Sequence, residues 1–302
     1  MDKRMNNYSQ VCDVKRVMLT EGRGAGLKLI EVSNGVLDFT LNESKALDIA
    51  KLSHKGMSLS FISKNGLVSG NTDFSRAFNG GMLYTCGLDS VGAREGYDIH
   101  GTFHNIPAQI TETAVNEDGI KITAEIYDTA LFGKNLVLKR TIETKAFSNE
   151  VTVTDILTNN GYREEDYCLL YHINTGYPML DESVIIDYDE EKIISRTTWA
   201  EKFKDAVKKF REPADNFEET CYFLKLKKPC VKIINLNRKK ALTIEYSGDT
   251  LPNLVEWKSI ASGDYALGIE PCTTFLDDYF KYNKLMAGES VTLKIILSAR
   301  DL

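Results

Sequence analysis

Apolar and polar residues alternate with a period of two along much of the chain, which is the pattern of β-strands that bury one face. The clearest runs are rich in Val, Ile, Thr and Tyr, and they cover residues 120–127, 137–143, 151–158, 231–236, 241–246 and 291–297. Turn-forming sequences separate such runs, for example NEDG at 116–119, NNG at 159–161 and SGD at 247–249. Helical segments of about 10–15 residues are almost absent between the runs, so the pattern excludes an alternating strand–helix fold. We therefore predict an all-β, antiparallel fold.

Two segments depart from the alternation. Residues 41–50 fit either a short helical turn or the start of a strand. Residues 198–211 carry apolar side chains at helical spacing, on one face, at Trp199, Phe203, Val207 and Phe210. Pro213 would end that helix. We expect a helix lying across the sheets here, in preference to a helix that binds a partner.

No linker, repeat or low-complexity tract divides the 302 residues, so we expect one domain over 1–302, with about the first 15 residues loosely ordered. The 37 Lys and Arg residues against 43 Asp and Glu residues leave a net charge of −6. This balance argues against binding to nucleic acid or to anionic membranes. The chain shows no membrane-spanning run, no signal-peptide core and no CxxC pair among its six cysteines. We expect a cytoplasmic protein with reduced thiols.

Residues that carry chemistry gather in three places. Residues 76–108 are rich in Gly, His and Asn and contain His100 and His104. His172 stands where an apolar strand gives way to a turn. Glu270 lies between a Gly-containing apolar strand and a proline, which favours a strand end over a helix.

These residues allow three interpretations. His100 and His104 would share one helical face as metal ligands, but Gly101 and Pro107 disfavour a helix, so we expect no metal. The histidines could instead be structural, with their hydrogen bonds satisfied in turns. They could also form an acid–base site, because an imidazole and a carboxylate can exchange protons near neutral pH. Spacing alone does not choose between the last two. The remaining histidine, His54, has polar neighbours and is expected in a solvated loop.

Four segments in this order resemble the aldose 1-epimerase (galactose mutarotase-like) superfamily, and more specifically its bacterial branch of uncharacterised aldose-epimerase-like proteins. The matching segments are GGMLYTCGL at 80–88, His100-Gly101 with NIPA at 105–108, His172 with Asn174 and GYP at 176–178, and Glu270-Pro271. The resemblance runs from about Val36 to the C-terminus. It implies a large antiparallel β-supersandwich with one or two short helices, and a reaction without cofactor or metal.

The resemblance also implies roles for single residues. Glu270 would be the general base that deprotonates the anomeric hydroxyl of a sugar, and His172 the general acid that protonates the ring oxygen. We expect these two groups on opposite sides of the O–C–O unit. His100 would hydrogen-bond the sugar near the reacting centre, and Arg76 would match the substrate-binding arginine.

Further residues are predicted to bind substrate. Asn105 belongs to one of the matching segments, and Tyr177 and Trp257 could stack on a sugar, although ordinary core packing explains such aromatic residues equally well. The chain has Thr102 where the branch commonly has an arginine, and His104 where it has a small residue. His104 could replace a lost hydrogen-bond donor or change the specificity.

We therefore predict a mutarotase-like enzyme that interconverts the α and β anomers of a free or modified sugar. The alternative is a non-catalytic carbohydrate-binding or sugar-sensing protein on the same fold. A third hypothesis is a metal-dependent isomerase or hydrolase built on His100, His104 and His172.

Overall fold

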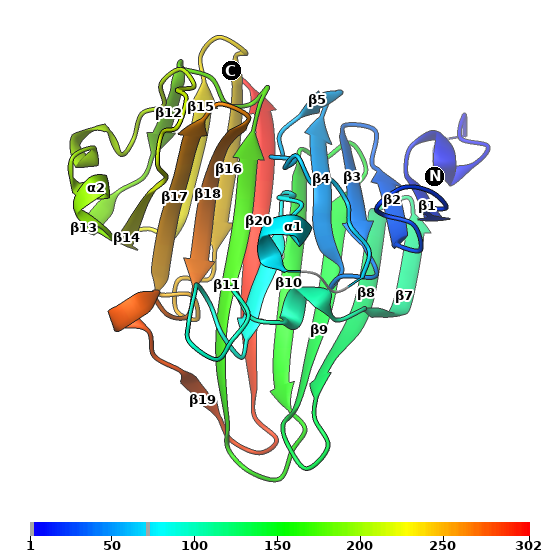
Figure 1. The fold of residues 1–302 in the computed structure, drawn as a ribbon. Helices are drawn as coiled ribbons and strands as arrows, with labels where there is room; N and C mark the ends of the chain where they lie inside the picture. The colour runs from blue at the N-terminus through cyan, green and yellow to red at the C-terminus, as the bar shows by residue number, and fades with distance from the viewer. Residues whose placement is uncertain (1–2, 71–72) are drawn as a thin grey trace.

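The computed structural model describes residues 3–70 and 73–302, and antiparallel strands dominate it (Figure 1). The expectation of loose order over about residues 1–15 falls partly on residues 1–2, which lie outside the described residues. Within that range the structure contains the 3₁₀ helix η1 (Tyr8–Gln10) and the start of β1 (Asp13–Met18).

The strands form three sheets in the described part of the chain. The five-stranded sheet follows chain order: β1, β2 (Lys28–Ser33), β3 (Leu37–Asn42), β4 (Asp48–His54) and β5 (Met57–Ser58). The eight-stranded sheet has the order β12 (Val184–Asp187), β15 (Cys230–Asn235), β16 (Lys240–Tyr246), β20 (Ser290–Asp301), β10 (Glu150–Asn159), β9 (Asn135–Lys145), β8 (Gly119–Thr129) and β7 (Gln109–Asn116). The seven-stranded sheet has the order β13 (Glu190–Ser195), β14 (Thr220–Leu226), β17 (Asn253–Ala261), β18 (Asp264–Cys272), β11 (Glu165–Gly176) and β19 (Asn283–Leu285), with β6 (Tyr84–Leu88) also paired to β11.

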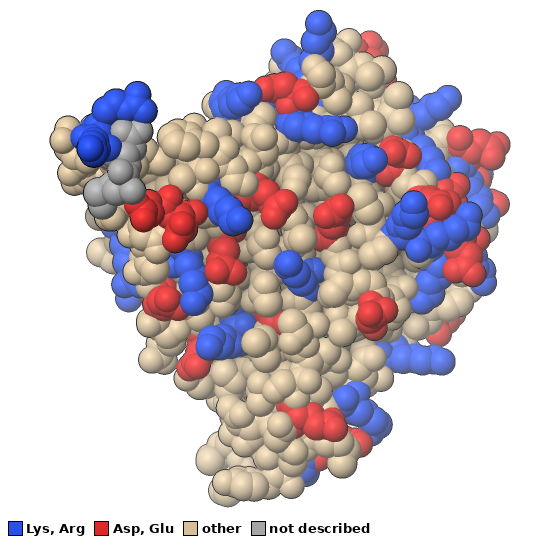
Figure 2. All heavy atoms as spheres, turned by 180° about the vertical axis from the view of Figure 1, so that it is seen from behind, with Lys and Arg blue, Asp and Glu red and all other residues tan. Residues whose placement is uncertain are grey.

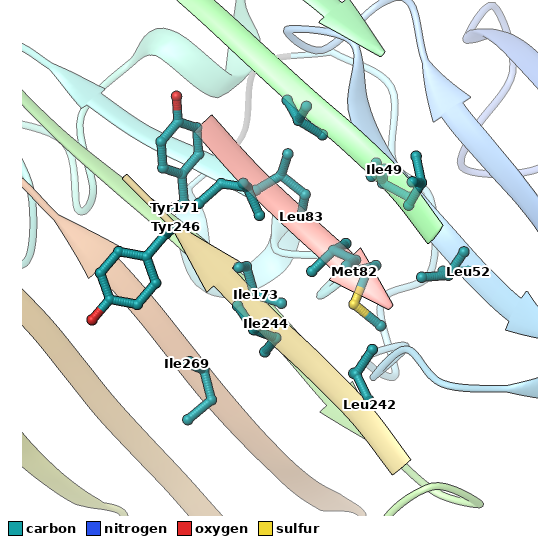
Figure 3. Packing of buried hydrophobic residues seen from close by; sticks show 14 of the residues in the cluster. Ile49, Leu52, Met82, Leu83, Tyr171, Ile173, Leu242, Ile244, Tyr246 and Ile269 are labelled. Carbon is teal, nitrogen blue, oxygen red and sulfur yellow. The ribbon is translucent and has the colours of Figure 1, made fainter. Parts of the chain in front are cut away.

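Backbone hydrogen bonds join the five-stranded and seven-stranded sheets into one layer. Leu83 N donates to Ile49 O over 3.0 Å, Phe61 N donates to Asn174 O over 2.9 Å, and Ser60 bridges to Thr175. Buried side chains of this layer pack against those of the eight-stranded sheet, as Figure 3 shows for β4, β11, β18 and β16. The predicted antiparallel β-supersandwich is confirmed. This shared core also supports the proposal that residues 1–302 form one domain.

All six strand runs predicted from alternation lie in the eight-stranded sheet, as β8, β9, β10, β15, β16 and β20. Burial alternates along these strands because one face of that sheet is exposed to solvent. The central strands β11, β17 and β18 are buried on both faces for most of their length, so they carry no alternation. His172 accordingly lies inside β11 and not at its end.

Helices are short. The described residues contain α1 (Phe74–Ala77) and α2 (Thr198–Glu201), and the 3₁₀ helices η2 (Phe103–Asn105), η3 (Lys204–Ala206) and η4 (Asp277–Tyr279). The prediction of one or two short helices is confirmed, but the predicted helix over 198–211 is wrong, because α2 ends after one turn. For residues 41–50 the strand interpretation is correct: β4 begins at Asp48.

The chain beyond α2 is held by contacts that a continuous helix would not allow. The buried ammonium of Lys258 donates to the carbonyls of Val207 and Lys209, and Lys209 forms a β-bridge with Ile185. Val207 and Phe210 are buried all the same. Trp199 and Phe203 are half-buried, so the helical spacing identified residues that pack inward but not the backbone conformation.

Arg140 lies fully buried on β9, where the three sheets meet. It makes a two-point contact with Asp155 of β10, at 2.9 and 2.7 Å, and its Nη1 donates to Asp48 of β4 over 2.7 Å. Nη2 also donates to Thr85 of β6 over 2.9 Å, and Tyr171 of β11 donates to Asp155 over 2.6 Å. We call these five residues the Arg140 cluster. It fixes the strand that carries His172.

No helix in residues 3–70 and 73–302 has both the length and the apolar character needed to span a membrane. Seen from behind, Lys and Arg residues are interspersed with Asp and Glu residues over the surface (Figure 2).

Candidate active site

A cavity of about 530 Å³ opens against the seven-stranded sheet. Its walls include the aromatic residues Phe61, Phe74, Phe78 and Trp257, and the titratable residues Lys64, His100, His172, Arg196, Glu219, Cys221, Asp264 and Glu270. Apolar walls with a few converging polar groups are typical of small-molecule sites. The cavity is therefore the candidate active site.

His172 and Glu270 meet at its base because their strands are antiparallel neighbours. Ile173 of β11 pairs with Ile269 of β18, which places the two side chains next to each other. His172 Nε2 lies 3.2 Å from Glu270 Oε1, and the side chains are 6% and 2% exposed. The contact lacks hydrogen-bond geometry, since Glu270 Oε1 and His172 Nδ1 have no hydrogen-bond partner within the described residues. Both groups are thus buried with unused hydrogen-bonding capacity.

Gly268 makes the close approach of these two side chains possible. A Cβ atom at this position would lie 2.6 Å from Glu270 Oε1 and 2.9 Å from His172 Cε1. Contacts this short require a neighbour to move. The glycine in the strand before Glu270 therefore leaves room for the two side chains.

His100 reaches the cavity from a strained loop. Its φ is +64°, a left-handed value that is unfavourable for a residue with a Cβ. The backbone N–H of Gly92 donates to His100 Nδ1 over 3.3 Å, so in the neutral ring the proton is on Nε2. Burial lowers the pKa of His100 to about 4, and Arg196 contributes to the decrease. His100 can therefore act as a neutral hydrogen-bond donor.

The cavity shifts the pKa values of His172 and Glu270 in opposite directions. Burial lowers the pKa of His172 well below its usual value, and His100 lowers it further. Burial also raises the pKa of Glu270 well above its usual value; Glu219 adds to this increase and Arg196 opposes it. A protonated His172 is thus a stronger acid than usual, and an ionised Glu270 is a stronger base than usual.

Aromatic side chains enclose the pair. The rings of Trp257 and Phe78 have their centroids 5.6 and 5.5 Å from the His172 ring. The Trp257 Nε1 donates to Glu219 over 2.6 Å, which fixes the indole on the cavity wall. Trp257 therefore packs on His172 and also offers a surface to a ligand.

Four of the predicted site residues line the cavity: His100, His172, Trp257 and Glu270. The other four do not. Arg76 is 78% exposed and pairs with Asp73, and Tyr177 is 68% exposed beyond the end of β11. His104 is buried with its ring against Tyr84, at a centroid distance of 4.5 Å, and Asn105 accepts a hydrogen bond from Lys45 over 3.3 Å. Arg76 points away because it lies on α1 between Phe74 and Phe78, which face the cavity.

The expectation that His54 is solvated is wrong. His54 is fully buried at the end of β4, where its ring contacts Asn149 over 3.0 Å and Lys240 over 2.8 Å. Its polar sequence neighbours do not indicate exposure, since Ser53 is also buried.

Several cavity residues were not identified from the sequence. Arg196, Glu219 and Lys64 come from separate segments that long-range pairing brings together, so no local motif marks them. Phe74 and Phe78 carry a usable signal, because their spacing of four, just before the GGMLYTCGL segment at 80–88, places both on one side of a helical turn.

Histidine and carboxylate side chains do not gather into a metal-binding arrangement: no group of three or more potential ligands was found among the described residues. His104 lies outside the cavity, so the three histidines of the metal hypothesis are not assembled around one point.

Solved structures of the same architecture show which fold this chain has. A protein from Klebsiella pneumoniae named "putative aldose 1-epimerase" superposes with a TM-score of 0.86 at 21% identity, over 96% of this chain and 84% of the other. A galactose mutarotase-like protein from Clostridium acetobutylicum gives 0.71 at 15% identity, over 97% and 100%. The fold is therefore that of the galactose mutarotase-like superfamily, and the resemblance predicted from the sequence is confirmed.

The family is defined more closely by sequence. A family model described as "Domain of unknown function (DUF4432)" matches residues 24–295, and the chain belongs to this family. No curated protein matches the chain in sequence.

Proposed function

We propose that this protein is a carbohydrate mutarotase-like isomerase that interconverts the α and β anomers of a free or modified sugar. The observation that carries the proposal is the buried contact between His172 Nε2 and Glu270 Oε1, 3.2 Å apart at the base of the cavity. The superfamily of the fold supports the reaction class, and the cavity walls suit a sugar ring.

In the proposed reaction, ionised Glu270 accepts the proton of the anomeric hydroxyl while protonated His172 donates a proton to the ring oxygen. The bond between C1 and the ring oxygen breaks and the C1–O1 bond becomes a carbonyl. Rotation about C1–C2 and the reverse proton transfers close the ring as the other anomer. The two side chains lie side by side rather than on opposite sides of the O–C–O unit, but the two oxygens share one carbon and are adjacent too.

The proton count of the pair suits a reversible reaction. The ionised Glu270 with the protonated His172, and the neutral pair that remains after ring opening, differ only in the position of protons, so neither state leaves a net charge in the buried site. His100 donates to a sugar oxygen, and Trp257 provides the stacking surface. Each positioned acid or base contributes about 10²–10⁴-fold.

The test is an anomer-exchange assay. Purified protein is added to freshly dissolved α-glucose, α-galactose and other free and phosphorylated aldoses, and equilibration is followed by polarimetry or NMR. We expect faster equilibration with at least one sugar, and a loss of about 10²–10⁴-fold in His172→Asn and in Glu270→Gln. Sugar-induced thermal stabilisation without any exchange would instead establish the non-catalytic sugar-binding alternative. Activity that survives both substitutions would remove the assigned roles.

Two further expectations belong to this proposal. All six cysteines are unpaired, which accords with a cytoplasmic location. The interspersed charges of Figure 2 accord with a small neutral partner in place of a nucleic acid or a membrane.

A further inference from the structure

Arg196 lines the cavity, and its positive charge acts on Glu270 and on His100. It directly follows β13, and its backbone N–H donates to Cys221 O over 2.9 Å. Its side chain is 25% exposed, whereas Lys64, the other cation of the cavity wall, is 66% exposed at the rim and paired with Asp264. Arg196 is therefore the more strongly interacting of the two cations.

Asp277 fixes one edge of the guanidinium. Nε and Nη2 of Arg196 donate to the two Asp277 oxygens over 2.6 and 2.9 Å, in the two-point geometry that arginine forms best. Burial raises the pKa of the Cys221 thiol, and the nearby Arg196 charge opposes this increase. Both hydrogen bonds to Asp277 use Nε and Nη2, so Nη1 is left to donate to a ligand, and Arg196 is part of the cavity wall.

The charge of Arg196 acts on two residues of the proposed site, His100 and Glu270. It lowers the pKa of His100 and opposes the burial that raises the pKa of Glu270. Glu219 acts on Glu270 in the opposite sense. The other titratable groups that face Glu270 are His172 and the buried thiols of Cys86, Cys221 and Cys272, and burial raises the pKa of each thiol, so the thiols stay uncharged.

We propose that Arg196, held by Asp277, binds a sugar hydroxyl through Nη1 and favours the ionised form of Glu270 that accepts the proton. Arg196 is thus both a binding residue and a residue that tunes the base. The inference rests on the proposed function for its chemistry. Arg76, the arginine expected from the sequence, points away from the cavity. Arg196 would therefore bind the substrate in its stead.

The electrostatic part is tested without any turnover. Protein carrying ¹³C at the glutamate carboxyl carbons is titrated by NMR, and the Glu270 signal is identified by its loss in Glu270→Gln. We expect Arg196→Gln to raise the pH midpoint of Glu270 by about one unit or more, because a nearby positive charge is lost. Arg196→Lys should keep the midpoint close to that of the wild type. Lys64→Gln is the matched control, since it removes a cation from the rim and should leave the midpoint unchanged.

The binding part is tested by kinetics with the sugar that the wild-type protein equilibrates fastest. Because lysine cannot reproduce the guanidinium fork, we expect Arg196→Lys to raise KM about tenfold or more while changing kcat little. If Arg196→Gln does not fold, Arg196→Lys and Glu219→Gln provide the test. Glu219→Gln removes a nearby negative charge and should therefore lower the pH midpoint of Glu270.

Each outcome decides something different. Equal Glu270 midpoints in the wild type and Arg196→Gln, or an unchanged KM in Arg196→Lys, would overturn the role of Arg196. Absence of exchange with every sugar, together with the expected midpoint shifts, would overturn the proposed function and leave the electrostatic role of Arg196 standing.

Discussion

Tyr171 and His172 are consecutive residues of β11, and they face two buried polar regions of opposite character. On one side, the Arg140 cluster uses the guanidinium completely: Asp155, Asp48, Thr85 and the carbonyl oxygen of Ala46 accept its hydrogen bonds. On the other side, His172 Nδ1 and Glu270 Oε1 are equally buried and have no hydrogen-bond partner within the described residues.

The difference indicates that the Arg140 cluster has a structural role and that the pair of His172 and Glu270 has a functional one. A buried charge whose hydrogen bonds are all satisfied contributes to a single arrangement of the strands, and breaking it leaves other charges uncompensated. A buried group with unused capacity costs stability and persists where it serves a ligand or a reaction. Strand β11 is thus held in place by the Arg140 cluster, whose hydrogen bonds are satisfied. The same strand carries His172, which forms with Glu270 a pair that has unused hydrogen-bonding capacity.

The largest effect is expected from Arg140→Met. This change leaves Asp155 and Asp48 buried without their cation, so the free energy of unfolding should fall by about 3–5 kcal/mol. Urea denaturation measures it. The matched control is Lys121→Met, which removes an exposed ion pair with Glu112 in the same sheet and should cost less than about 1 kcal/mol. A similar loss in the two variants would contradict the structural role of the cluster.

Next in size is Gly268→Ala, which acts on the site. The added Cβ displaces His172 or Glu270, and a misplacement of about 1 Å lowers the exchange rate by about 100-fold. Gly248→Ala is the control, because its Cβ would contact Pro229, outside the cavity lining. A Gly268→Ala variant with wild-type activity would show that the close approach of the pair is unimportant.

The burial of His104 should make the free energy of unfolding depend on pH. Burial lowers the pKa of His104 to about 3, so from the unfolded value of 6.5 downward only the unfolded state binds this proton. The contribution of a neutral His104 is therefore fully present above pH 6.5 and is lost as the pH falls toward 3.

Substitution of His104 isolates that contribution. Between about pH 6.5 and pH 5 it amounts to about 2 kcal/mol, at about 1.36 kcal/mol per pH unit. His104→Asn should therefore lose about that much less stability than the wild type over this range, as measured by urea denaturation at both pH values. Parallel losses would mean that His104 titrates normally in the folded protein.

The smallest effect is expected from Tyr171→Phe. It removes one hydrogen bond to Asp155, which keeps both bonds from Arg140, so the cost should be about 1 kcal/mol. Tyr127→Phe, which removes an exposed hydrogen bond to Glu125, is the control and should cost less. If Tyr171→Phe lowered the exchange rate far more than it lowered stability, the two sides of β11 would be coupled more closely than this account requires.

The sequence predicted some parts of the fold and of the candidate site and not others, for physical reasons. Alternation revealed six of the eight strands of the eight-stranded sheet, since one face of that sheet is solvated, but β17 is buried on both faces and shows no such pattern. That His172 and Glu270 belong to the candidate site could be predicted, because each lies in a recognisable segment. Arg196 could not, because it enters the cavity through pairing with Asp277, 81 residues away.

Two predictions that were wrong, the site role of Arg76 and the helix over 198–211, have different causes. Arg76 is two residues from Phe74 and from Phe78, and on a helical turn this places it on the opposite side from the cavity. Lys258 fixes the carbonyls of Val207 and Lys209, which replaces the predicted helix beyond Glu201. The second outcome depends on contacts between distant segments, which a pattern in one segment does not contain.

The most direct test of the central claim is the anomer-exchange rate of His172→Asn, Glu270→Gln and the double variant, measured by NMR on a sugar at equilibrium. Residues that transfer protons as one unit lose activity together. We predict that each single variant loses about 10²–10⁴-fold and that the double variant loses little more. Losses that multiply in the double variant, or single variants as active as the wild type, would contradict the account.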